Sequence, residues 1–543
     1  DIGIVFNHES GQVLKLTYQE IRAQAGALRH FLKNFMTEGD VLAAYMPNIP
    51  ETVISMLACS SLGGVFTSTS SDFGVSGVLD RFKQSKPKVL VAAISYEYNG
   101  KVFNQMEKIR EIAKKLPDLQ NIILVDFLKK EEITEDIPKA ISWEKAISIP
   151  EKLAFHPVGF NSPQYIMYSS GTTGKPKCIV HSVGGTLLQH LKEHSLHTGV
   201  SREKNLFYFT TCGWMMWNWL VSGLYFGGKI TLYEGSPGLP SIDDFFKIIE
   251  RQKINIFGTS PKFLKALEDS GYNKNLELAS LQTILSTGAP LLDEQFDFIY
   301  QKIKGDIQVA SITGGTDIIG CFMLGNPILP VYRGEIQSIG LGMDVDCFDD
   351  EGNSLIDTEG ELVCKQSFPS RPIYFLDDEN GEKINQAYFN KYEDIWHHGD
   401  FILINIRGGS KVMGRSDATL NPGGVRIGTA EIYAQTETLN YLVDSVCVGK
   451  VIDGDVQVFL FVKMHLNEEL TIERKDEIKG LIRKNTTPRH MPQDIFVVSD
   501  IPYTRSGKKM ELAVTRLINQ KELKNIEAVA NPDCLKDFQK KYF

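Results

Sequence analysis

The sequence predicts an α/β protein: a large N-terminal domain of several subdomains, built on parallel sheets, and a small α+β domain at the C-terminal end. Short apolar runs such as residues 41–46 and 89–93 alternate with helical patterns, as buried parallel strands do. A chain of 543 residues is too long for one hydrophobic core. Glycine-bearing turns near residue 414 separate the last segment from the rest. We therefore expect an N-terminal domain over residues 1–413, a hinge over 414–418 and a C-terminal domain over 419–543.

The strand–helix rhythm extends through the first 290 residues. The elements predicted there are strands over residues 2–6, 41–46, 89–93, 122–125, 229–233, 254–257 and 283–286, and helices over 51–62 and from Asp243. Between about Val331 and Ile406 short strands and turns predict a small β subdomain. The glycine turns at 408–410 and 414–417 are expected at the domain boundary. Beyond them, strands over 446–448, 456–462 and 495–498 and a charged helix from Ile472 predict a compact α+β unit.

Composition excludes several classes of protein. A net charge of −9 argues against nucleic-acid binding, because no basic stripe exists to release counterions. The eight cysteines lie too far apart for zinc spacing and are expected to be buried thiols in a reducing compartment. No apolar run approaches 18 residues, so we expect a cytosolic protein without membrane insertion. The chain starts at Asp1 in strand-like sequence, which suggests that a further N-terminal segment precedes it.

A glycine- and hydroxyl-rich loop follows the apolar-rich run 165–168 and predicts a nucleotide phosphate site. Its hydroxyls, ammonium groups and backbone N–H groups can converge on a polyphosphate, and its glycines let the backbone approach closely. The P-loop pattern is not met, because Gly171 and Gly174 are too close and Pro176 follows Lys175. The residues concerned are Ser169, Ser170, Gly171, Thr172, Thr173, Gly174 and Lys175.

Three further motifs carry chemistry of the same kind. Thr316 and Asp317 follow two glycines and an apolar strand over 307–310, a pattern that can place a hydroxyl on phosphate and a carboxylate on Mg²⁺, or form an ordinary turn. Asp400 is predicted on a turn before a strand over 401–404, placed to accept hydrogen bonds from ribose hydroxyls. A second glycine turn near the C-terminal end presents Lys508.

Two other features have competing explanations. The residues His190-Leu-Lys-Glu-His194 match a metallopeptidase pattern, but no third ligand is identifiable and the pattern is interpreted as coincidental. The segment 214–219 holds three tryptophans at helical spacing. Core packing and a pocket wall are equally good interpretations of it.

These motifs, in this order and spacing, resemble the adenylate-forming superfamily of acyl-CoA synthetases, luciferases and peptide-synthetase adenylation domains. The matching elements are segments 168–177, 209–217, 315–317, 399–400 with 414–417, and 507–508. Several are weak alone, but jointly they are specific and cover the whole chain. Within the superfamily, the runs 176–186, 213–219, 314–319 and 419–426 are most similar to the branch of acetoacetyl-CoA synthetases.

The resemblance implies an ATP-dependent ligase with a mobile C-terminal lid. A carboxylate, expected to be acetoacetate, attacks the α-phosphate of MgATP, and coenzyme A then displaces AMP from the acyl-adenylate. The implied catalytic residues are Lys508, Thr316 and Asp317, with Asp317 also the Mg²⁺ ligand and Asp417 the hinge. The implied ATP site is the loop 169–175 with Gly288, Ala289, Pro290, Gly314, Gly315, Asp400, Arg415 and Arg426. The implied coenzyme A site comprises Gly423, Gly424, Lys101 and Arg483. The implied acyl pocket comprises Trp214, Asn218 and Gly314.

The sequence departs from the commoner superfamily pattern at two positions. Gly314 stands where acetate-specific relatives have a tryptophan, so we expect room there for two more carbons and a ketone oxygen. Asp317 is one methylene shorter than the usual glutamate, which favours a water-mediated contact with Mg²⁺.

Other functions remain open on the sequence alone. The main alternative is another short- or medium-chain acyl-CoA synthetase. An amino-acid-activating module and a non-enzymatic adenylate sensor are less favoured, since a sensor would be expected to lack Lys508 or Asp400. The oligomeric state is not predicted.

Overall fold

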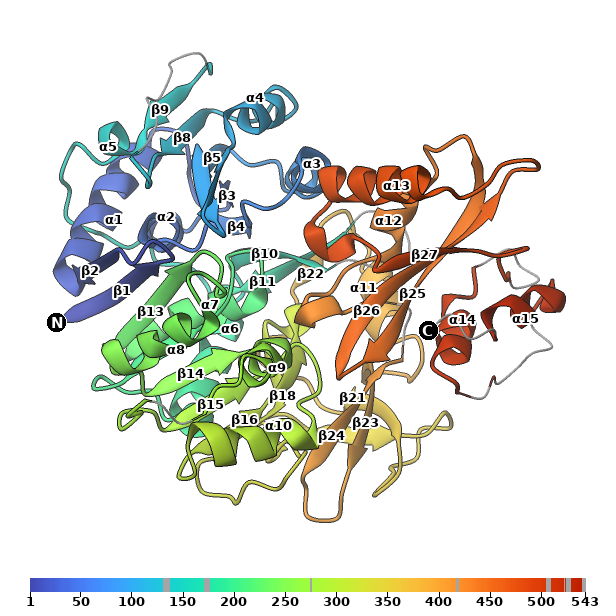
Figure 1. Ribbon diagram of the computed structural model, residues 1–543. Coiled ribbons are helices and arrows are strands. Elements are labelled where there is room, and N and C mark those ends of the chain that lie inside the picture. The colour runs from blue at the N-terminus through green and yellow to red at the C-terminus, as the bar shows by residue number, and fades with distance from the viewer. Residues whose placement is uncertain are drawn as a thin grey trace.

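The computed structural model describes residues 1–129, 137–169, 176–273, 276–416, 419–503, 509–521, 523 and 529–539. Two large sheets and a smaller β unit form the N-terminal part of the molecule, and an α+β unit from the end of the chain lies beside them (Figure 1). The predicted α/β class with a small C-terminal α+β unit is confirmed. We call residues 419–543 the lid.

The first large sheet has eight strands, and its parallel part carries the βαβ rhythm. Its parallel part consists of β4, β3, β5, β8 and β9 in spatial order, and β10 joins it in parallel through β4. Strands β11 and β22 extend the sheet antiparallel beyond β10. In spatial order the sheet comprises β22 (Tyr374–Phe375), β11 (Lys177–Ser182), β10 (Pro163–Ser169), β4 (Val65–Thr69), β3 (Val41–Tyr45), β5 (Val89–Ala93), β8 (Asn121–Val125) and β9 (Ala140–Ser142).

The second large sheet has seven strands and is parallel except at one edge, where β1 and β2 form a hairpin. Its carboxyl-terminal edge, where ligands bind in open α/β sheets, leads into the loops that follow β15 and β16. In spatial order it comprises β16 (Gln308–Ser311), β15 (Thr283–Ser286), β14 (Ile256–Thr259), β12 (Asn205–Tyr208), β13 (Lys229–Glu234), β1 (Ile2–His8) and β2 (Val13–Thr17).

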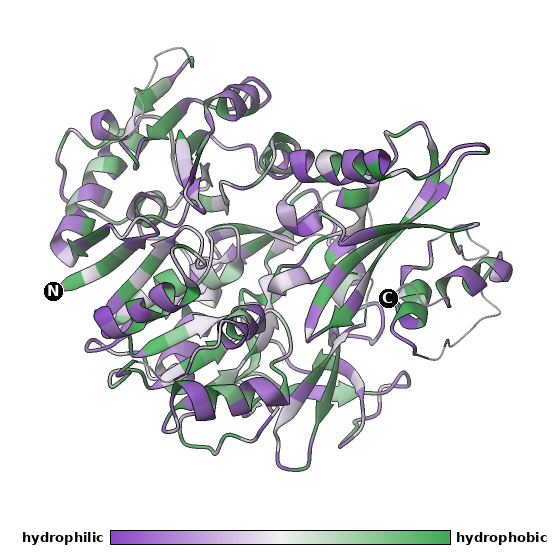
Figure 2. Ribbon diagram, in the orientation of Figure 1, coloured by the Kyte–Doolittle hydropathy of each residue, from purple (hydrophilic) through white to green (hydrophobic). Residues whose placement is uncertain are grey.

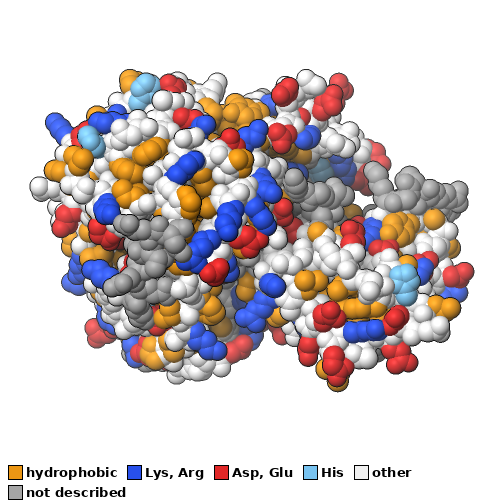
Figure 3. Space-filling view, turned by 90° about the horizontal axis from the view of Figure 1, so that it is seen from above, with side chains coloured by type: hydrophobic (Ala, Val, Ile, Leu, Met, Phe, Trp, Pro, Cys, Tyr) orange, Lys and Arg blue, Asp and Glu red, His pale blue; other side chains and the backbone are white. Residues whose placement is uncertain are grey.

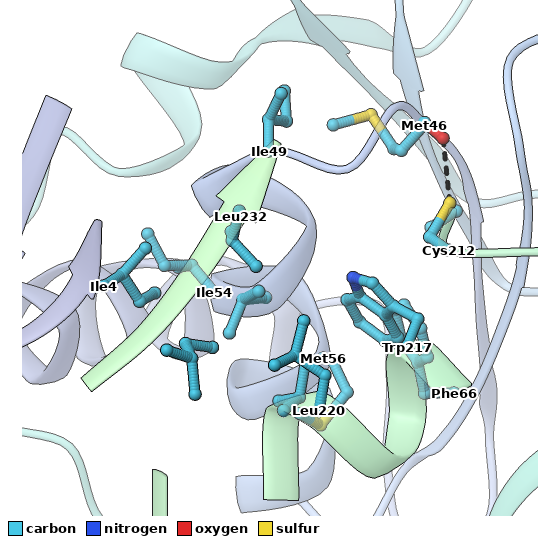
Figure 4. Packing of buried hydrophobic residues seen from close by; sticks show 14 of the residues in the cluster. Ile4, Met46, Ile49, Ile54, Met56, Phe66, Cys212, Trp217, Leu220 and Leu232 are labelled. Carbon is cyan, nitrogen blue, oxygen red and sulfur yellow. Dashed lines mark hydrogen bonds between the residues drawn. The ribbon is translucent and has the colours of Figure 1, made fainter. Parts of the chain in front are cut away.

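The main hydrophobic core joins the two sheets. Phe66 of β4 stacks on Trp217 of α7 with ring centroids 5.8 Å apart, and Leu232 of β13 packs in the same cluster (Figure 4). Helix α2 is buried on almost every side, which fits its position inside this core. The helices of the N-terminal part are α1 (Tyr18–Leu32), α2 (Pro50–Ser61), α3 (Val75–Ser85), α4 (Met106–Lys114), α5 (Trp143–Ala146), α6 (Val183–Lys192), α7 (Met215–Ser222), α8 (Ile242–Arg251), α9 (Pro261–Asp269), α10 (Asp293–Phe298) and α11 (Glu382–Tyr388).

Three smaller sheets complete the N-terminal part. The predicted small β subdomain is confirmed as an antiparallel sheet of β20 (Val345–Phe348), β21 (Gly360–Cys364), β23 (Trp396–Ile404) and β24 (Ser410–Arg415). A three-stranded antiparallel sheet comprises β17 (Thr313–Gly315), β18 (Gly320–Leu324) and β19 (Ser338–Ile339). The hairpin of β6 (Ser95–Tyr98) and β7 (Lys101–Asn104) forms a sheet of its own.

The lid is built on a long hairpin. Strands β25 (Leu442–Ile452) and β26 (Asp455–Met464) pair antiparallel, and β27 (Asp494–Val497) joins β26 in parallel. Helix α13 alternates hydrophilic and hydrophobic residues along its length, as a helix with one buried side does (Figure 2). The lid helices are α12 (Thr429–Thr436), α13 (Ile472–Asn485), α14 (Glu511–Ile518) and α15 (Leu535–Phe538).

The local structure differs from the sequence-based predictions at three places, two of them near the predicted domain boundary and one at the start of a strand. The turn at 408–410 is a hairpin inside the β subdomain, because Asn405 N donates to Gly409 O at 2.9 Å and β24 follows at once. Strand β24 runs to Arg415, two residues into the segment predicted as the hinge. Asp400 lies within β23 and not on a turn before it, because the polar run 396–400 continues the antiparallel pairing with β21 and β24.

Among the described residues, no helix is both long enough and apolar enough to cross a membrane. The eight cysteines are free and buried, as the sequence predicts.

Candidate active site

A cavity lies where the carboxyl-terminal loops of the seven-stranded sheet meet β17, β24 and the first loop of the lid. Many of the residues predicted from the sequence line this cavity. They are Trp214, Gly288, Ala289, Pro290, Gly314, Gly315, Thr316, Asp400, Arg415, Gly424 and Arg426. These residues are up to 212 positions apart in the chain, from Trp214 to Arg426. The structure therefore brings eleven of the predicted site residues to one cavity.

Asp317 is the electrostatic centre of this region. It is 2% exposed, its Oδ1 accepts a hydrogen bond of 2.6 Å from the Tyr388 hydroxyl, and its Oδ2 forms an ion pair with Arg426 of the lid. Burial alone would raise the pKa of Asp317, but the charges of Arg426 and Lys177 hold that pKa well below its usual range. The carboxylate is therefore ionised at neutral pH, and Arg426 is its cationic partner in this structure.

Arg426 reaches the nucleotide side of the site from the lid. Its Nη1 lies 3.1 Å from the hydroxyl of Ser169, the last residue of β10. One guanidinium thus contacts both the start of the predicted phosphate loop and the predicted metal ligand, as planar, fork-shaped arginine can.

Asp400 and Arg415 face each other across β23 and β24. Their side chains pair at 2.9 Å, and both are largely buried. His398 packs beside them, with its Nε2 3.5 Å from Asp400 Oδ2. The pair offers a carboxylate acceptor and a guanidinium donor at one wall of the cavity, a combination that suits a vicinal diol.

The lid meets the N-terminal part through two glycines. A Cβ atom added to Gly288 would lie 2.7 Å from the Cα of Gly424, and the φ angles of the two residues are 99° and 80°. The side-chain amide of Asn421 donates to the carbonyl of Gly288. Only glycines allow these backbones to approach so closely with positive φ angles.

The predicted acyl pocket is only partly assembled. Trp214 is half-buried and lines the cavity, whereas Trp217 and Trp219 are fully buried, so the tryptophan segment is both pocket wall and core. Asn218 is 1% exposed on α7 and is not among the described residues that line the cavity. Gly314 does line the cavity. However, a glycine is needed at this position for a reason other than making room for the acyl group.

The absence of a side chain at Gly314 is required by the packing of β17 against β18. A Cβ atom there would overlap the carbonyl oxygen of Gly320 and lie 2.7 Å from Cys321 Cα. A side chain would thus meet backbone before it reached the cavity. The expectation that Gly314 makes room for two more carbons is not supported by this geometry.

Gly314→Ala is therefore expected to destabilise the protein by about 1–3 kcal/mol, because backbone atoms must move to admit one methyl group. Activity with acetate and with acetoacetate should fall in parallel. Gly315→Ala is the control for stability, because its Cβ would meet nothing closer than the His398 ring at 3.4 Å. Melting temperatures and acid selectivity measure the outcome. A changed selectivity at an unchanged melting temperature would restore the pocket interpretation.

Several predicted residues lie outside this cluster or outside the described residues. The structure does not describe Ser170 to Lys175, Asp417 or Lys508.

Gly423 is next to the cavity, and its N–H donates to Asp455 at 2.8 Å. Lys101 on β7 and Arg483 on α13 are exposed. Arg483 is near enough to the β6–β7 hairpin to act on Tyr96, whose pKa burial raises and the Arg483 charge lowers.

The histidine pattern at 190–194 is structural. Both imidazoles are buried, with His190 Nε2 2.5 Å from Ile319 O and His194 Nε2 2.7 Å from Trp219 O. Across the described part of the chain, no three His, Cys, Asp or Glu side chains are grouped to hold a metal. The metallopeptidase interpretation is excluded for these residues.

Sequence reasoning missed two residues around Asp317, Tyr388 and His181, and placed a third, Lys177, only in the phosphate loop. Tyr388 stacks on Trp396 with centroids 3.8 Å apart and presents its hydroxyl to the carboxylate. His181 Nε2 lies 2.9 Å from the carbonyl oxygen of Thr316. Lys177 lies over the Tyr388 ring at 5.4 Å. Only Lys177, in the phosphate-loop motif, carried a sequence signal.

Buried histidines make acid stability testable. Burial lowers the pKa of His181, His190 and His398 to about 4, against an ordinary value of 6.5. Between these values the unfolded chain binds protons that the folded chain does not, so stability should fall as the pH decreases from 6.5 toward 4. Burial raises the pKa of some carboxyl groups, including Glu234. These groups make the folded chain more stable as the pH decreases, so they oppose the effect of the histidines.

His190→Gln isolates the effect of one histidine. The wild type should lose about 1–2 kcal/mol more unfolding free energy than this variant between pH 6.5 and 5, because glutamine does not titrate. Chemical denaturation at both pH values measures the difference. Parallel losses in the two proteins would contradict the buried neutral state of His190.

Comparison with known proteins agrees with this site. A family model described as AMP-binding enzyme matches residues 4–374, more than half of the chain. The acetoacetyl-coenzyme A synthetase of Rhizobium meliloti (strain 1021) is 46% identical over 537 residues, covering 98% of this chain and 82% of that protein. The acetoacetyl-CoA synthetase of Xenopus tropicalis is 43% identical over 534 residues, covering 96% of this chain and 80% of that protein.

A solved structure shares the fold over nearly the whole chain. The acetoacetyl-CoA synthetase from Streptomyces lividans matches with a TM-score of 0.76 and 37% sequence identity, covering 99% of this chain and 83% of that one. The chain therefore belongs to the family of AMP-binding enzymes, the adenylate-forming superfamily that its motifs resemble.

Proposed function

We propose that this protein is an acid–thiol ligase that converts acetoacetate, ATP and coenzyme A into acetoacetyl-CoA, AMP and pyrophosphate. The convergence of Thr316, Asp400 with Arg415, and Arg426 on one cavity carries the proposal. Arg426 also pairs with the buried Asp317 beside it. The choice of acetoacetate is supported by relatives named acetoacetyl-CoA synthetases, which match nearly the whole chain.

In the first half-reaction a carboxylate oxygen of the acid attacks the α-phosphorus of ATP, and pyrophosphate leaves. Catalysis is then mostly alignment and neutralisation of charge. We assign Ser169 and the loop 170–175 to the β- and γ-phosphates, Thr316 to the α-phosphate, and Asp400 with Arg415 to the ribose. Lys508 is assigned to the attacking carboxylate and the α-phosphate.

The donor set around Asp317 fits Mg²⁺. This ion commonly uses one or two protein carboxylates and completes its shell with water and substrate phosphate oxygens. Asp317 supplies one ionised carboxylate, oriented by Tyr388. When bound, Mg²⁺ would neutralise charge on the phosphates. Arg426 holds the same carboxylate in the lid orientation described here.

In the second half-reaction the thiolate sulfur of coenzyme A attacks the acyl carbonyl carbon, and AMP leaves. We infer that the described lid orientation belongs to this step, because the glycine loop 421–426 faces the cavity. The contacts of Lys509, next to Lys508, are within the lid. Figure 3 shows Lys and Arg side chains gathered on the face beside the junction with the lid. We assign the coenzyme A phosphates to Lys101 and Arg483, both of which are exposed.

The test is a screen of carboxylates for pyrophosphate release, with and without coenzyme A. Acetoacetate should give the highest kcat/KM among acetate, acetoacetate, butyrate and octanoate, and acetoacetyl-CoA should accumulate only with coenzyme A present. A preference for butyrate or octanoate would make the protein a different acyl-CoA synthetase. Pyrophosphate release independent of any acid would overturn the proposal.

A further inference from the structure

A buried ion pair crosses the interface between the N-terminal part and the lid. Arg81 on α3 and Glu431 on α12 approach to 3.1 Å, and their side chains are 7% and 9% exposed. The domain assignment places these residues on opposite sides of the predicted hinge. Neither contacts the cavity of the candidate active site.

Arg81 is fixed on the N-terminal side by three further contacts. Its Nη1 donates to the carbonyl oxygen of Gly77 at 2.8 Å. The guanidinium lies over the rings of Phe73 at 4.7 Å and Tyr168 at 5.8 Å. Tyr168 directly precedes Ser169, so Arg81 packs against the base of the predicted phosphate loop.

Glu431 is fixed on the lid side. Its Oε2 accepts from the N–H of Gly428 at 3.2 Å, which caps helix α12, and lies 3.1 Å from His490 Nε2. His490 is 2% exposed and pairs through Nδ1 with Thr487 at 2.9 Å. Gly428 is two residues after Arg426, so Glu431 also holds the turn that brings Arg426 to Asp317.

The pair depends on the orientation of the lid. Alongside it, the N–H of Gly74 donates to the carbonyl oxygen of Thr486 at 3.0 Å, so α3 and the end of α13 are in direct backbone contact (Figure 1). A rotation of the lid that moves α12 from α3 separates Arg81 from Glu431. A charge that loses its partner in a buried position is strongly unfavourable, so the pair discriminates between orientations.

We propose that Arg81 and Glu431 are positioning residues that select the lid orientation used for acyl transfer to coenzyme A. The proposal rests on the proposed function, since it assigns the described orientation to the second half-reaction. It adds an interaction remote from the cavity that holds Arg426 and the glycine loop in place during transfer.

Glu431→Gln is the most selective test, because glutamine keeps an oxygen to cap α12 and removes only the charge. In single-turnover assays with preformed acetoacetyl-adenylate, transfer to coenzyme A should slow at least tenfold. Pyrophosphate release in the absence of coenzyme A should be unchanged or faster. Arg81→Gln should reproduce this pattern, and the double variant should be no slower than either single variant, because both remove the same interaction.

Arg489→Gln is the matched control. Arg489 pairs with Asp72 across the same interface at 3.6 Å, but both side chains are substantially exposed, so both half-reactions should keep their wild-type rates. Hydrogen exchange gives a readout that does not need activity. The Gly74 amide should exchange faster in Glu431→Gln than in the wild type or in Arg489→Gln.

Equal slowing of both half-reactions with a lower melting temperature would reduce the pair to a structural role and overturn the proposal. Wild-type transfer rates in Glu431→Gln with unchanged exchange at Gly74 would also overturn it. If no carboxylate supports pyrophosphate release, the proposed function fails, whereas faster exchange at Gly74 would still support the pair as the contact that holds the lid.

Discussion

Lys508→Ala is expected to lower the rate of acyl-adenylate formation by a factor of 10³ or more, about 4 kcal/mol of barrier. Acyl transfer from supplied acetoacetyl-adenylate to coenzyme A should largely survive. The reason is that Lys508 is the cation assigned to bridge the attacking carboxylate and the α-phosphate, two anions that repel each other as they approach. Pyrophosphate release and transfer, measured separately in single-turnover experiments, check the result.

Lys509→Ala is the control for this experiment. Lys509 Nζ lies 2.7 Å from Asp444 Oδ1 and 2.7 Å from the carbonyl oxygen of Ser445, and it lies over the Tyr433 ring at 4.1 Å. All three partners are in the lid, so this variant should lower the melting temperature and slow both half-reactions alike. Equal slowing of both half-reactions by Lys508→Ala would remove its assigned role.

The parallel core could be predicted from sequence because its strands are buried on both faces. Strands β5 and β15 have the predicted bounds, since continuous apolar runs leave little choice of structure. Strand β23 was predicted too short. Its first half, Trp396 to Asp400, contains two histidines, a glycine and the site residue Asp400, and its pairing with β21 and β24 outweighs this turn-like composition.

The candidate site was predictable where a residue belongs to a local motif. Asp317, Asp400, Arg415 and Arg426 were each found within a short run, and the structure brings them together. Tyr388 and His181 could not be found in this way, because only tertiary packing carries α11 and β11 to Asp317. The role of Gly314 could not be found either, because its constraint is the backbone of β18.

The second half-reaction should depend on Gly424, as the first depends on Lys508, but by a smaller factor. A Cβ atom at Gly424 would lie 2.8 Å from Gly288 Cα, and its φ angle of 80° is unfavourable for any other residue. Gly424→Ala should therefore prevent the lid from closing on Gly288. Acyl transfer should slow about 100-fold, or ~3 kcal/mol, while adenylate formation in another lid orientation should be nearly unchanged.

Gly423→Ala separates the steric effect from backbone strain. Its φ angle of 58° is also positive, but an added Cβ would meet only Lys262, with Cδ at 3.4 Å and Nζ at 3.7 Å. A lysine side chain moves easily, whereas the backbone of Gly288 does not, so transfer should slow much less in Gly423→Ala. The same single-turnover assay measures both variants. If Gly424→Ala transferred the acyl group at the wild-type rate, the contact between Gly288 and Gly424 would have no part in acyl transfer, and the described lid orientation would have to be assigned to a different step.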